Sequence, residues 1–198
     1  MQFKLGTLLL SVCLTFALQT SVRAVEDTTS FYTHFQNKAF LDQNGQLLKT
    51  TSLKGKVILF NFIYTQCSTV CPVQTKQLIE IQKSFPAEVK QQVQFVSVSL
   101  DPLNDTPKKL KAYAKKMQVD FSSWTLITGK PEDIQHITEQ LSLFGNPAAN
   151  QNKTVVRPNN HTTQLWLVSK NGQLMMQYGG ISIDMARISK EVTQLTKM

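Results

Sequence analysis

Two cysteines, Cys67 and Cys71, stand four residues apart in the sequence Cys-Ser-Thr-Val-Cys-Pro. In a helical turn, residues at positions i and i+4 lie on one face, with Cβ atoms roughly 5–6 Å apart. Two thiolates placed in this way bind one soft metal ion, or close into a disulfide after a small adjustment. Unpaired backbone N–H groups at a helix start favour thiolate over thiol, so we expect lowered pKa values for these thiols. Two buried structural cysteines are the alternative.

The donor types at this pair favour copper(I). Cu(I) accepts two or three soft ligands, and two thiolates with one imidazole suit it. Structural zinc prefers four protein ligands, and the sequence shows no obvious fourth ligand. Of the three histidines, we expect His34, in a polar N-terminal segment, and His136, off the apolar face of its helix, to be surface residues. The position of His161 must be considered together with the fold.

Strands and helices are expected to alternate around the cysteine pair. A continuous apolar run over residues 57–63 predicts a buried central strand directly before it. Asn44-Gly45 and Asn171-Gly172 predict tight hairpin turns, in which both central residues need positive φ. The other expected elements are strands at 93–100, 124–128, 164–168 and 174–178, and helices beginning at Pro72, Pro107, Pro131 and about residue 185.

This order predicts an α/β fold of the thioredoxin-like type, a three-layer sandwich of a mixed β-sheet with helices on both faces and an N-terminal hairpin. Chemistry in such a sheet belongs where a strand ends and a helix begins, which is the position of residues 65–72. Pro72 is expected at the first helical position, with Cys71 near the helix cap and Cys67 in the preceding loop. A thioredoxin-like sheet brings the start of strand 164–168 beside the dithiol helix. We therefore expect Cys67, Cys71 and His161 to be metal ligands.

Several short motifs along the chain resemble those of one protein family. They lie at residues 55–57, 64–72, 99–102 with 105–107, and 126–129, and at His161 followed by Leu165. In these motifs the chain resembles the Sco (SenC) family of copper-delivery proteins used in cytochrome c oxidase assembly. The resemblance runs from about residue 40 to the last helix. It implies that the family's two copper-binding cysteines fall on Cys67 and Cys71, and its distal copper-binding histidine on His161.

Two departures from the family pattern concern the oxidation state of the copper. Many members have an acidic residue where Asn160 stands, and Pro-Asp where Ser68-Thr69 stand. Losing these negative charges weakens the binding of Cu(II) more than that of Cu(I), which depends on sulfur. The resemblance therefore implies copper as Cu(I), with Cu(II) as the less favoured second state.

Two functions are compatible with these residues. A copper(I) metallochaperone would pass its ion by ligand exchange to the copper-site subunit of cytochrome c oxidase, or to another copper or thiol protein. An extracytoplasmic thiol–disulfide oxidoreductase would use Cys67 and Cys71 as a redox pair on partner cysteines. Such an enzyme usually carries a cis-proline just before the strand facing the dithiol, whereas this chain has His161-Thr162 there and Pro158 three residues earlier. This difference favours the chaperone. A thiol peroxidase would not need this histidine and cysteine pair together.

The N-terminal residues 1–24 have the layout of a secretory signal peptide, with Lys4, an apolar run over 5–18 and Ala24 before the expected cut. The run is shorter than the roughly 20 residues of a membrane span, so cleavage is favoured over a retained anchor. Cys13 lacks the small preceding residue of a lipid-attachment site. We expect a signal peptide at 1–24, a polar lead-in at 25–35 and a thioredoxin-like domain at 36–198. The protein would be periplasmic, and attached to the outer face of the inner membrane if the segment is retained.

The remaining charged residues are expected on a solvated helix face, in a turn and at a helix cap. The net charge is +8, and the lysines at 108–116 lie on the polar side of an expected helix, which predicts a solvated face. No arginine and aromatic patch accompanies them, so nucleic-acid binding is not expected, although a basic surface favours acidic partners or membrane head groups. Asp101 is expected in a turn, and Asp105 or Thr106 as the cap of the next helix. Partner docking is the alternative for the two aspartates.

Overall fold

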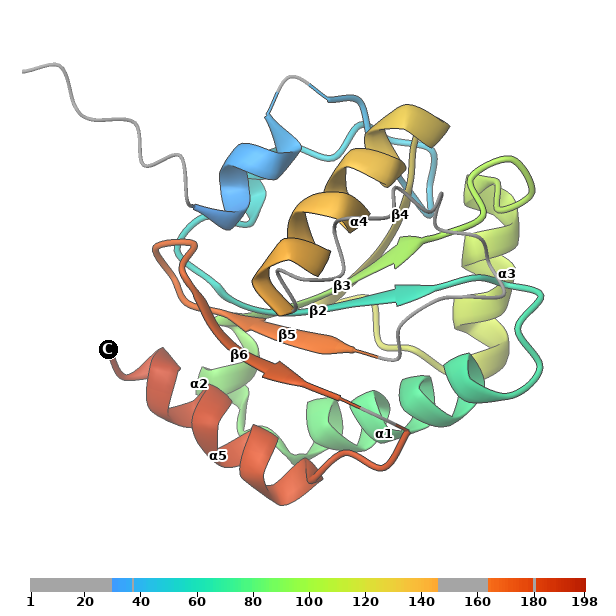
Figure 1. Cartoon of the computed structure of the whole chain (residues 1–198). Coiled ribbons are helices and arrows are strands. Elements are labelled where there is room, and N and C mark those ends of the chain that lie inside the picture. Colours follow the sequence, from blue (N-terminus) through green and yellow to red (C-terminus); the bar gives the residue numbers. More distant parts are fainter. Residues whose placement is uncertain (1–29, 37, 146–163, 180) are drawn as a thin grey trace, which may run out of the picture.

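A six-stranded mixed sheet organises the chain, in the order β1-β4-β3-β2-β5-β6 (Figure 1). The computed structural model describes residues 30–36, 38–145, 164–179 and 181–198. The strands are β1 (Leu41–Asp42), β2 (Val57–Ile63), β3 (Val93–Ser99), β4 (Trp124–Thr128), β5 (Leu165–Val168) and β6 (Leu174–Tyr178). The helices are η1 (Phe31–Phe35), η2 (Thr50–Ser52), α1 (Val70–Ser84), α2 (Ala87–Lys90), α3 (Pro107–Met117), α4 (Pro131–Gly145) and α5 (Met185–Thr196).

The strands pair in both directions. β2, β3 and β4 are parallel, whereas β5 runs antiparallel to β2, and β6 antiparallel to β5. Every residue of β2 is buried, as a strand covered on both faces requires. The expected mixed sheet and its central strand are confirmed.

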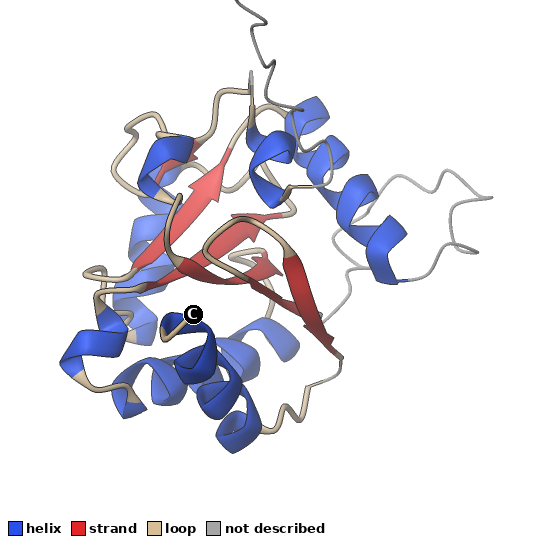
Figure 2. Ribbon diagram, turned by 90° about the vertical axis from the view of Figure 1, so that its left-hand side faces the viewer, coloured by secondary structure: helices blue, strands red, loops and turns tan. Residues whose placement is uncertain are grey.

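Helices cover the sheet on both faces, as Figure 2 shows in a view turned by 90°. Because side chains alternate along a strand, Val57 and Leu59 of β2 face one core and Ile58 and Phe60 face the other. The first core also receives apolar side chains from α1, α3 and α5, and the second receives them from η1 and α4. The expected three layers are therefore present.

The two Asn-Gly turns form where they were expected, but in another geometry. Among the described residues other than glycine, only Gln118 has a positive φ, so neither asparagine adopts the conformation expected of it. The positive φ belongs to the glycine alone, at 78° in Gly45 and 84° in Gly172. Asp42 stabilises the first turn, because its Oδ1 accepts hydrogen bonds from the backbone N–H groups of Asn44 and Gln46. The first turn is thus stabilised by a side-chain carboxylate, and it does not need a positive φ at Asn44.

The N-terminal hairpin is smaller than expected. Its two arms share a single β-bridge, between Leu41 and Leu47. The strand β1 pairs instead with β4, antiparallel, at the edge of the main sheet. The turn therefore adds an edge strand to the sheet.

The end of the expected polar lead-in belongs to the folded domain, which corrects the boundary placed at residue 36. Residues 31–35 form η1, and Phe31 and Phe35 are buried to 2% and 1% exposure. Their rings pack on Phe60 of β2 at centroid distances of 5.2 and 6.2 Å. Three aromatic side chains in this short stretch outweigh its polar neighbours, because burial of aromatic area dominates local packing.

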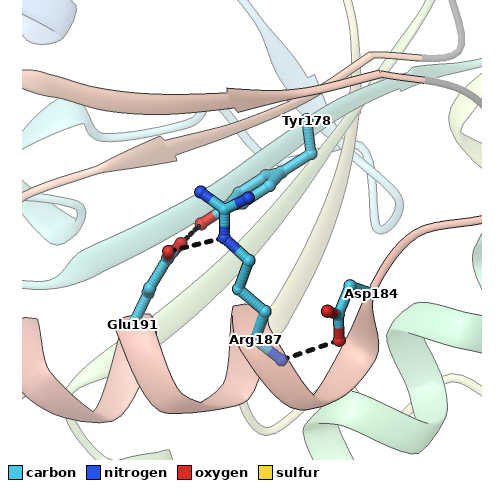
Figure 3. Close-up of polar contacts among 4 residues, drawn as sticks. All are labelled: Tyr178, Asp184, Arg187 and Glu191. Atoms are coloured by element: carbon cyan, nitrogen blue, oxygen red, sulfur yellow. Dashed lines mark hydrogen bonds and ion pairs between the residues drawn. The ribbon is translucent and has the colours of Figure 1, made fainter.

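A cluster of polar contacts holds the last helix against the last strand (Figure 3). Asp184 caps α5 by accepting from the backbone N–H of Arg187 at 3.0 Å. The Arg187 Nε donates to Glu191 Oε1 at 2.8 Å, and its guanidinium lies over the Tyr178 ring, 5.9 Å from the centroid. The Tyr178 hydroxyl donates to Glu191 Oε2. These contacts join β6 to α5 at the surface.

Over the described ranges, no helix has the length and apolar character needed to cross a membrane. The expected signal peptide at residues 1–24 lies outside those ranges.

Candidate metal and thiol site

The two cysteines lie where the buried central strand gives way to a helix. β2 ends at Ile63 and α1 begins at Val70, so Cys67 occupies the connecting loop and Cys71 the second position of the helix. The expected helix start at Pro72 was two residues late. Proline is tolerated at the third position because the first four N–H groups of a helix have no partner within it. Cys71 is therefore inside the first turn.

The sulfur of Cys67 acts as an acceptor at the start of α1. The cap residue Thr69 makes no side-chain capping hydrogen bond. Instead, the backbone N–H of Cys71 donates to Cys67 Sγ at 3.4 Å. Both cysteines are thiols in the structure, with exposures of 5% for Cys67 and 3% for Cys71. The helix start thus supplies a donor to one sulfur, as a thiolate-stabilising site requires.

The environment of Cys67 favours its thiolate. Burial raises the pKa of Cys67, but donors around the sulfur outweigh it and lower the pKa to about 6. These donors are the backbone N–H groups of Cys71 and Thr69, the Cys71 thiol and the Tyr64 hydroxyl. The lowered pKa expected from the helix start applies to this cysteine.

Cys71 shows the opposite behaviour. Burial raises the pKa of Cys71, and the neighbouring Cys67 sulfur and the negative charge of Asp105 raise it further, against a backbone hydrogen bond at Tyr64 that lowers it. The two pKa values therefore shift in opposite directions, which at neutral pH favours a thiolate at Cys67 and a thiol at Cys71. The expectation of a lowered pKa for both cysteines was wrong for Cys71, because burial disfavours its charged form and nearby negative charges disfavour it further.

Asp105 has a structural role that differs from the one expected. It is fully buried, and its Oδ2 accepts from the Thr65 backbone N–H at 3.0 Å and from Ser99 Oγ at 2.6 Å. Its Oδ1 accepts from the Thr65 hydroxyl. The helix cap is Thr106, whose side chain accepts from Lys109 N. Asp105 is thus neither a cap nor a docking residue, and it ties the loop that carries Cys67 to the end of β3.

The first turns of α1 are anchored by buried polar contacts. Gln74 Oε1 accepts from Asn61 Nδ2 at 2.9 Å, and Asn61 Oδ1 accepts from Ser97 Oγ at 2.7 Å. On the next position of the helix, Thr75 and Tyr113 share a hydrogen bond of 2.8 Å between their hydroxyls. Satisfied buried networks of this kind give a helix one defined position. The helix carrying Cys71 is therefore fixed to the sheet and to α3.

The third expected ligand, His161, lies outside the described residues. Within the described part of the chain, no group of three or more His, Cys, Asp or Glu side chains has the arrangement of a metal site. His136 lies on α4, which packs on the opposite face of the sheet from α1, and His34 lies in η1. The structure thus describes two sulfur donors, which suit a soft ion such as Cu(I).

Comparison with known proteins places the chain in a family. A family model described as SCO1/SenC matches residues 24–197. This chain belongs to the SCO1/SenC family. The crystal structure of a SCO1/SenC family lipoprotein from Bacillus anthracis is 36% identical, with a TM-score of 0.65, over 79% of this chain and 91% of that one. The likeness confirms the thioredoxin-like fold.

Two further Sco structures share this fold. BsSco, described as a member of the Sco family of cytochrome c oxidase assembly proteins with a disulfide switch, is 29% identical. Its TM-score is 0.62, and the match covers 81% of this chain and 91% of BsSco. ScoI of Bradyrhizobium japonicum, solved with copper bound, is 22% identical with a TM-score of 0.59, over 80% of this chain and 96% of ScoI. At that identity the match to ScoI shows the fold alone.

Proposed function

We propose that this protein is a copper(I) metallochaperone with Cys67, Cys71 and His161 as ligands, and that it delivers copper for assembly of the copper site of cytochrome c oxidase. The observation that carries the proposal is the pair of buried thiols at the start of α1. Thiolate sulfur selects Cu(I) over the harder divalent ions. Membership of the SCO1/SenC family supports the choice of metal.

The site residues would contribute in different ways to copper binding. Cys67 already provides a thiolate at neutral pH, so it binds without losing a proton. Cys71 must release its proton, because only the deprotonated sulfur is a ligand. His161 would supply a neutral imidazole. We propose Cu(I) as the cargo and Cu(II) as a weaker second state, since no carboxylate stands at 68, 69 or 160.

An anaerobic Cu(I) titration of the reduced protein tests this function. We expect one tightly bound equivalent, and a weaker affinity after His161→Ala. His136→Ala is the matched control, because that histidine lies on the opposite face of the sheet, and its affinity should equal that of the unchanged protein. Absence of tight Cu(I) uptake by the unchanged protein would exclude the chaperone, and an unchanged affinity in His161→Ala would remove this histidine from the ligand set.

The difference in pKa between the Cys67 and Cys71 thiols favours a second candidate function, that of a thiol–disulfide oxidoreductase. The Cys67 thiolate would attack one sulfur of a partner disulfide, which forms a mixed disulfide and releases the other partner sulfur as a thiolate. Cys71 would then lose its proton and attack Cys67 Sγ, which closes a disulfide between the two residues and releases the second partner thiol. The partner is reduced by two electrons and the cysteine pair is oxidised. Rapid reduction of a protein disulfide, without Cu(I) uptake, would identify this function.

We propose that the protein acts outside the cytosol, in the periplasm. The signal-like residues 1–24 support export, and the Bacillus anthracis relative is described as a lipoprotein. Retention of the N-terminal segment would attach the domain to the outer face of the inner membrane. The partner would be the copper-site subunit of the oxidase or another copper or thiol protein.

A further inference from the structure

A groove between α1 and α3 opens beside Cys67. It encloses about 570 Å³ and includes Cys67 among its lining residues, whereas Cys71 is not among them. Lys76 of α1 faces it from one helix, and Lys109 and Lys116 of α3 line it from the other. We call this feature the α1–α3 groove. A partner sulfur or copper ligand that approaches through it would meet Cys67 first.

The charge of the groove is of one sign. Its lining contains three lysines and no acidic residue. In the described part of the chain the ion pairs are Lys38–Asp133, Lys83–Glu80 and Arg187–Glu191, so none of the three groove lysines has a carboxylate partner there. Clefts lined by charge of one sign concentrate ligands of the opposite sign.

Apolar groups, which we call the floor, also line the groove and distinguish it from an ordinary solvated helix face. Met117 and the Tyr113 ring contribute to the lining, and the Tyr113 hydroxyl is held by Thr75 rather than left to solvent. A chain segment bound here would place apolar atoms on the floor and negative charges against the lysines. Hydrated small ions would leave the apolar part of such a surface uncovered.

We propose that the α1–α3 groove docks an acidic segment of the partner protein, in which Asp or Glu residues flank the cysteine that meets Cys67. This proposal rests on the proposed function, and it names the chemistry of the partner that the same site recognises. The three lysines orient the segment by its charge, and the apolar floor receives a side chain next to its cysteine. Discrimination between partners would then come from charges beside the reacting cysteine.

The test uses peptides whose single cysteine is activated as a mixed disulfide with 5-thio-2-nitrobenzoate. Attack by the Cys67 thiolate forms a protein–peptide disulfide and releases the coloured thiolate, so the release rate reports the encounter at Cys67. The reduced protein is offered an acidic peptide and a peptide of the same length with Gln in place of Asp and Glu. We expect the acidic peptide to react about tenfold faster at low salt, and this ratio to fall as ionic strength rises.

Two triple variants separate the groove from the overall charge of the protein. Lys76→Gln with Lys109→Gln and Lys116→Gln removes the groove lysines. Lys108→Gln with Lys115→Gln and Lys190→Gln removes the same net charge from positions that do not line it. We expect the rate ratio to fall towards one in the first variant and to persist in the second. Because the ratio is compared, a general change in the reactivity of Cys67 cancels.

Other outcomes would overturn the docking proposal. A rate ratio of the two peptides near one in the unchanged protein would show that the groove does not select a partner by its charge. An equal fall of this ratio in both triple variants would show the same. A ratio that persists in the groove variant, with loss of its binding to vesicles of anionic lipid, would assign the lysines to a membrane surface. Cu(I) titration of the same proteins keeps the proposals distinct, because docking can fail while copper binding is retained.

Discussion

Cys67 and Cys71 are four residues apart, yet the protein gives their sulfurs different chemistry. The N–H groups at the start of α1 point to Cys67 Sγ, and the Tyr64 hydroxyl adds another donor. Cys71 lies deeper, with the Cys67 sulfur and the Asp105 carboxylate close enough to disfavour a second negative charge. In the proposed functions, the first sulfur would attack a disulfide or bind the metal first, and the second would resolve the mixed disulfide or complete the metal site.

This asymmetry predicts the pH dependence of alkylation. In the reduced protein, Cys67 should react with iodoacetamide with a midpoint near pH 6, because its pKa is lowered to about 6. The sign follows from the thiolate being the nucleophile: the rate rises as the pH passes upward through that value, and then levels off. Mass spectrometry of peptides containing each cysteine measures the two rates separately.

Cys71 provides an internal comparison in the same experiment. It should remain unmodified throughout this range, because its pKa is raised by burial. A midpoint for Cys67 above pH 8, or equal reaction of both cysteines, would show that the first turn of α1 does not stabilise one thiolate.

At the scale of elements, the site depends on two connections that are far apart in the sequence. The loop from β2 to α1 carries Cys67, and the loop from β3 to α3 carries Asp105. Hydrogen bonds from Thr65 to the Asp105 carboxylate join the two loops across 40 positions of sequence. The carboxyl ends of the parallel strands β2 and β3 lie at the same edge of the sheet. This contact therefore holds the Cys67 loop against the loop that follows β3.

Replacing Asp105→Asn should lower the free energy of unfolding by about 1–3 kcal/mol. The carboxylate accepts hydrogen bonds at both oxygens, whereas an amide offers one oxygen and two N–H donors, so at least one buried donor of Thr65 or Ser99 loses its acceptor. Urea unfolding of the reduced protein measures the change.

Asp101→Asn is the matched control in the same loop. Asp101 is partly exposed, and among the described residues its carboxylate accepts only from the Asn104 amide. Its change in stability should stay within about 0.5 kcal/mol. Equal losses in the two variants would show that the buried contacts of Asp105 do not hold the loop.

At the scale of the whole molecule, the sheet separates two hydrophobic cores, and only one of them contains the two cysteines. One core packs beneath the thiol site and is covered by α1, α3 and α5, while the other is covered by η1 and α4 (Figure 1). The second core contains a chain of aromatic contacts that begins in η1, with Phe35 packed 4.9 Å from Phe31 and 5.4 Å from Phe40, measured between ring centroids. The N-terminal residues 30–36 are therefore part of the fold.

Phe35→Ala should lower the free energy of unfolding by about 3–5 kcal/mol, because it leaves a cavity in the second core. The control is the neighbouring exposed residue, Gln36→Ala, for which a change within about 0.5 kcal/mol is expected. Urea unfolding midpoints compare the two. A loss as small in Phe35→Ala as in Gln36→Ala would restore the view that the domain begins after residue 35.

Local sequence was sufficient for the parts of this protein that depend on neighbouring residues. The apolar run at 57–63 predicted β2, Thr106-Pro107 predicted the start of α3, and the spacing of Cys67 and Cys71 predicted two sulfurs at one site. An apolar run, a helix-capping pair and a cysteine spacing are patterns of a few neighbouring residues, so a single sequence displays them.

Only the tertiary structure decided which cysteine has the lowered pKa, what Asp105 contacts and that residues 31–35 pack in the core. Each of these depends on burial and on hydrogen-bond or packing partners contributed by distant segments, such as Thr65 for Asp105 and Phe60 for Phe35. The pattern Asp-Thr-Pro fits a helix cap and a buried anchor equally well. The desolvation of a thiol or a carboxylate is a property of the surrounding chain, and it is set when β2, β3 and α1 pack together.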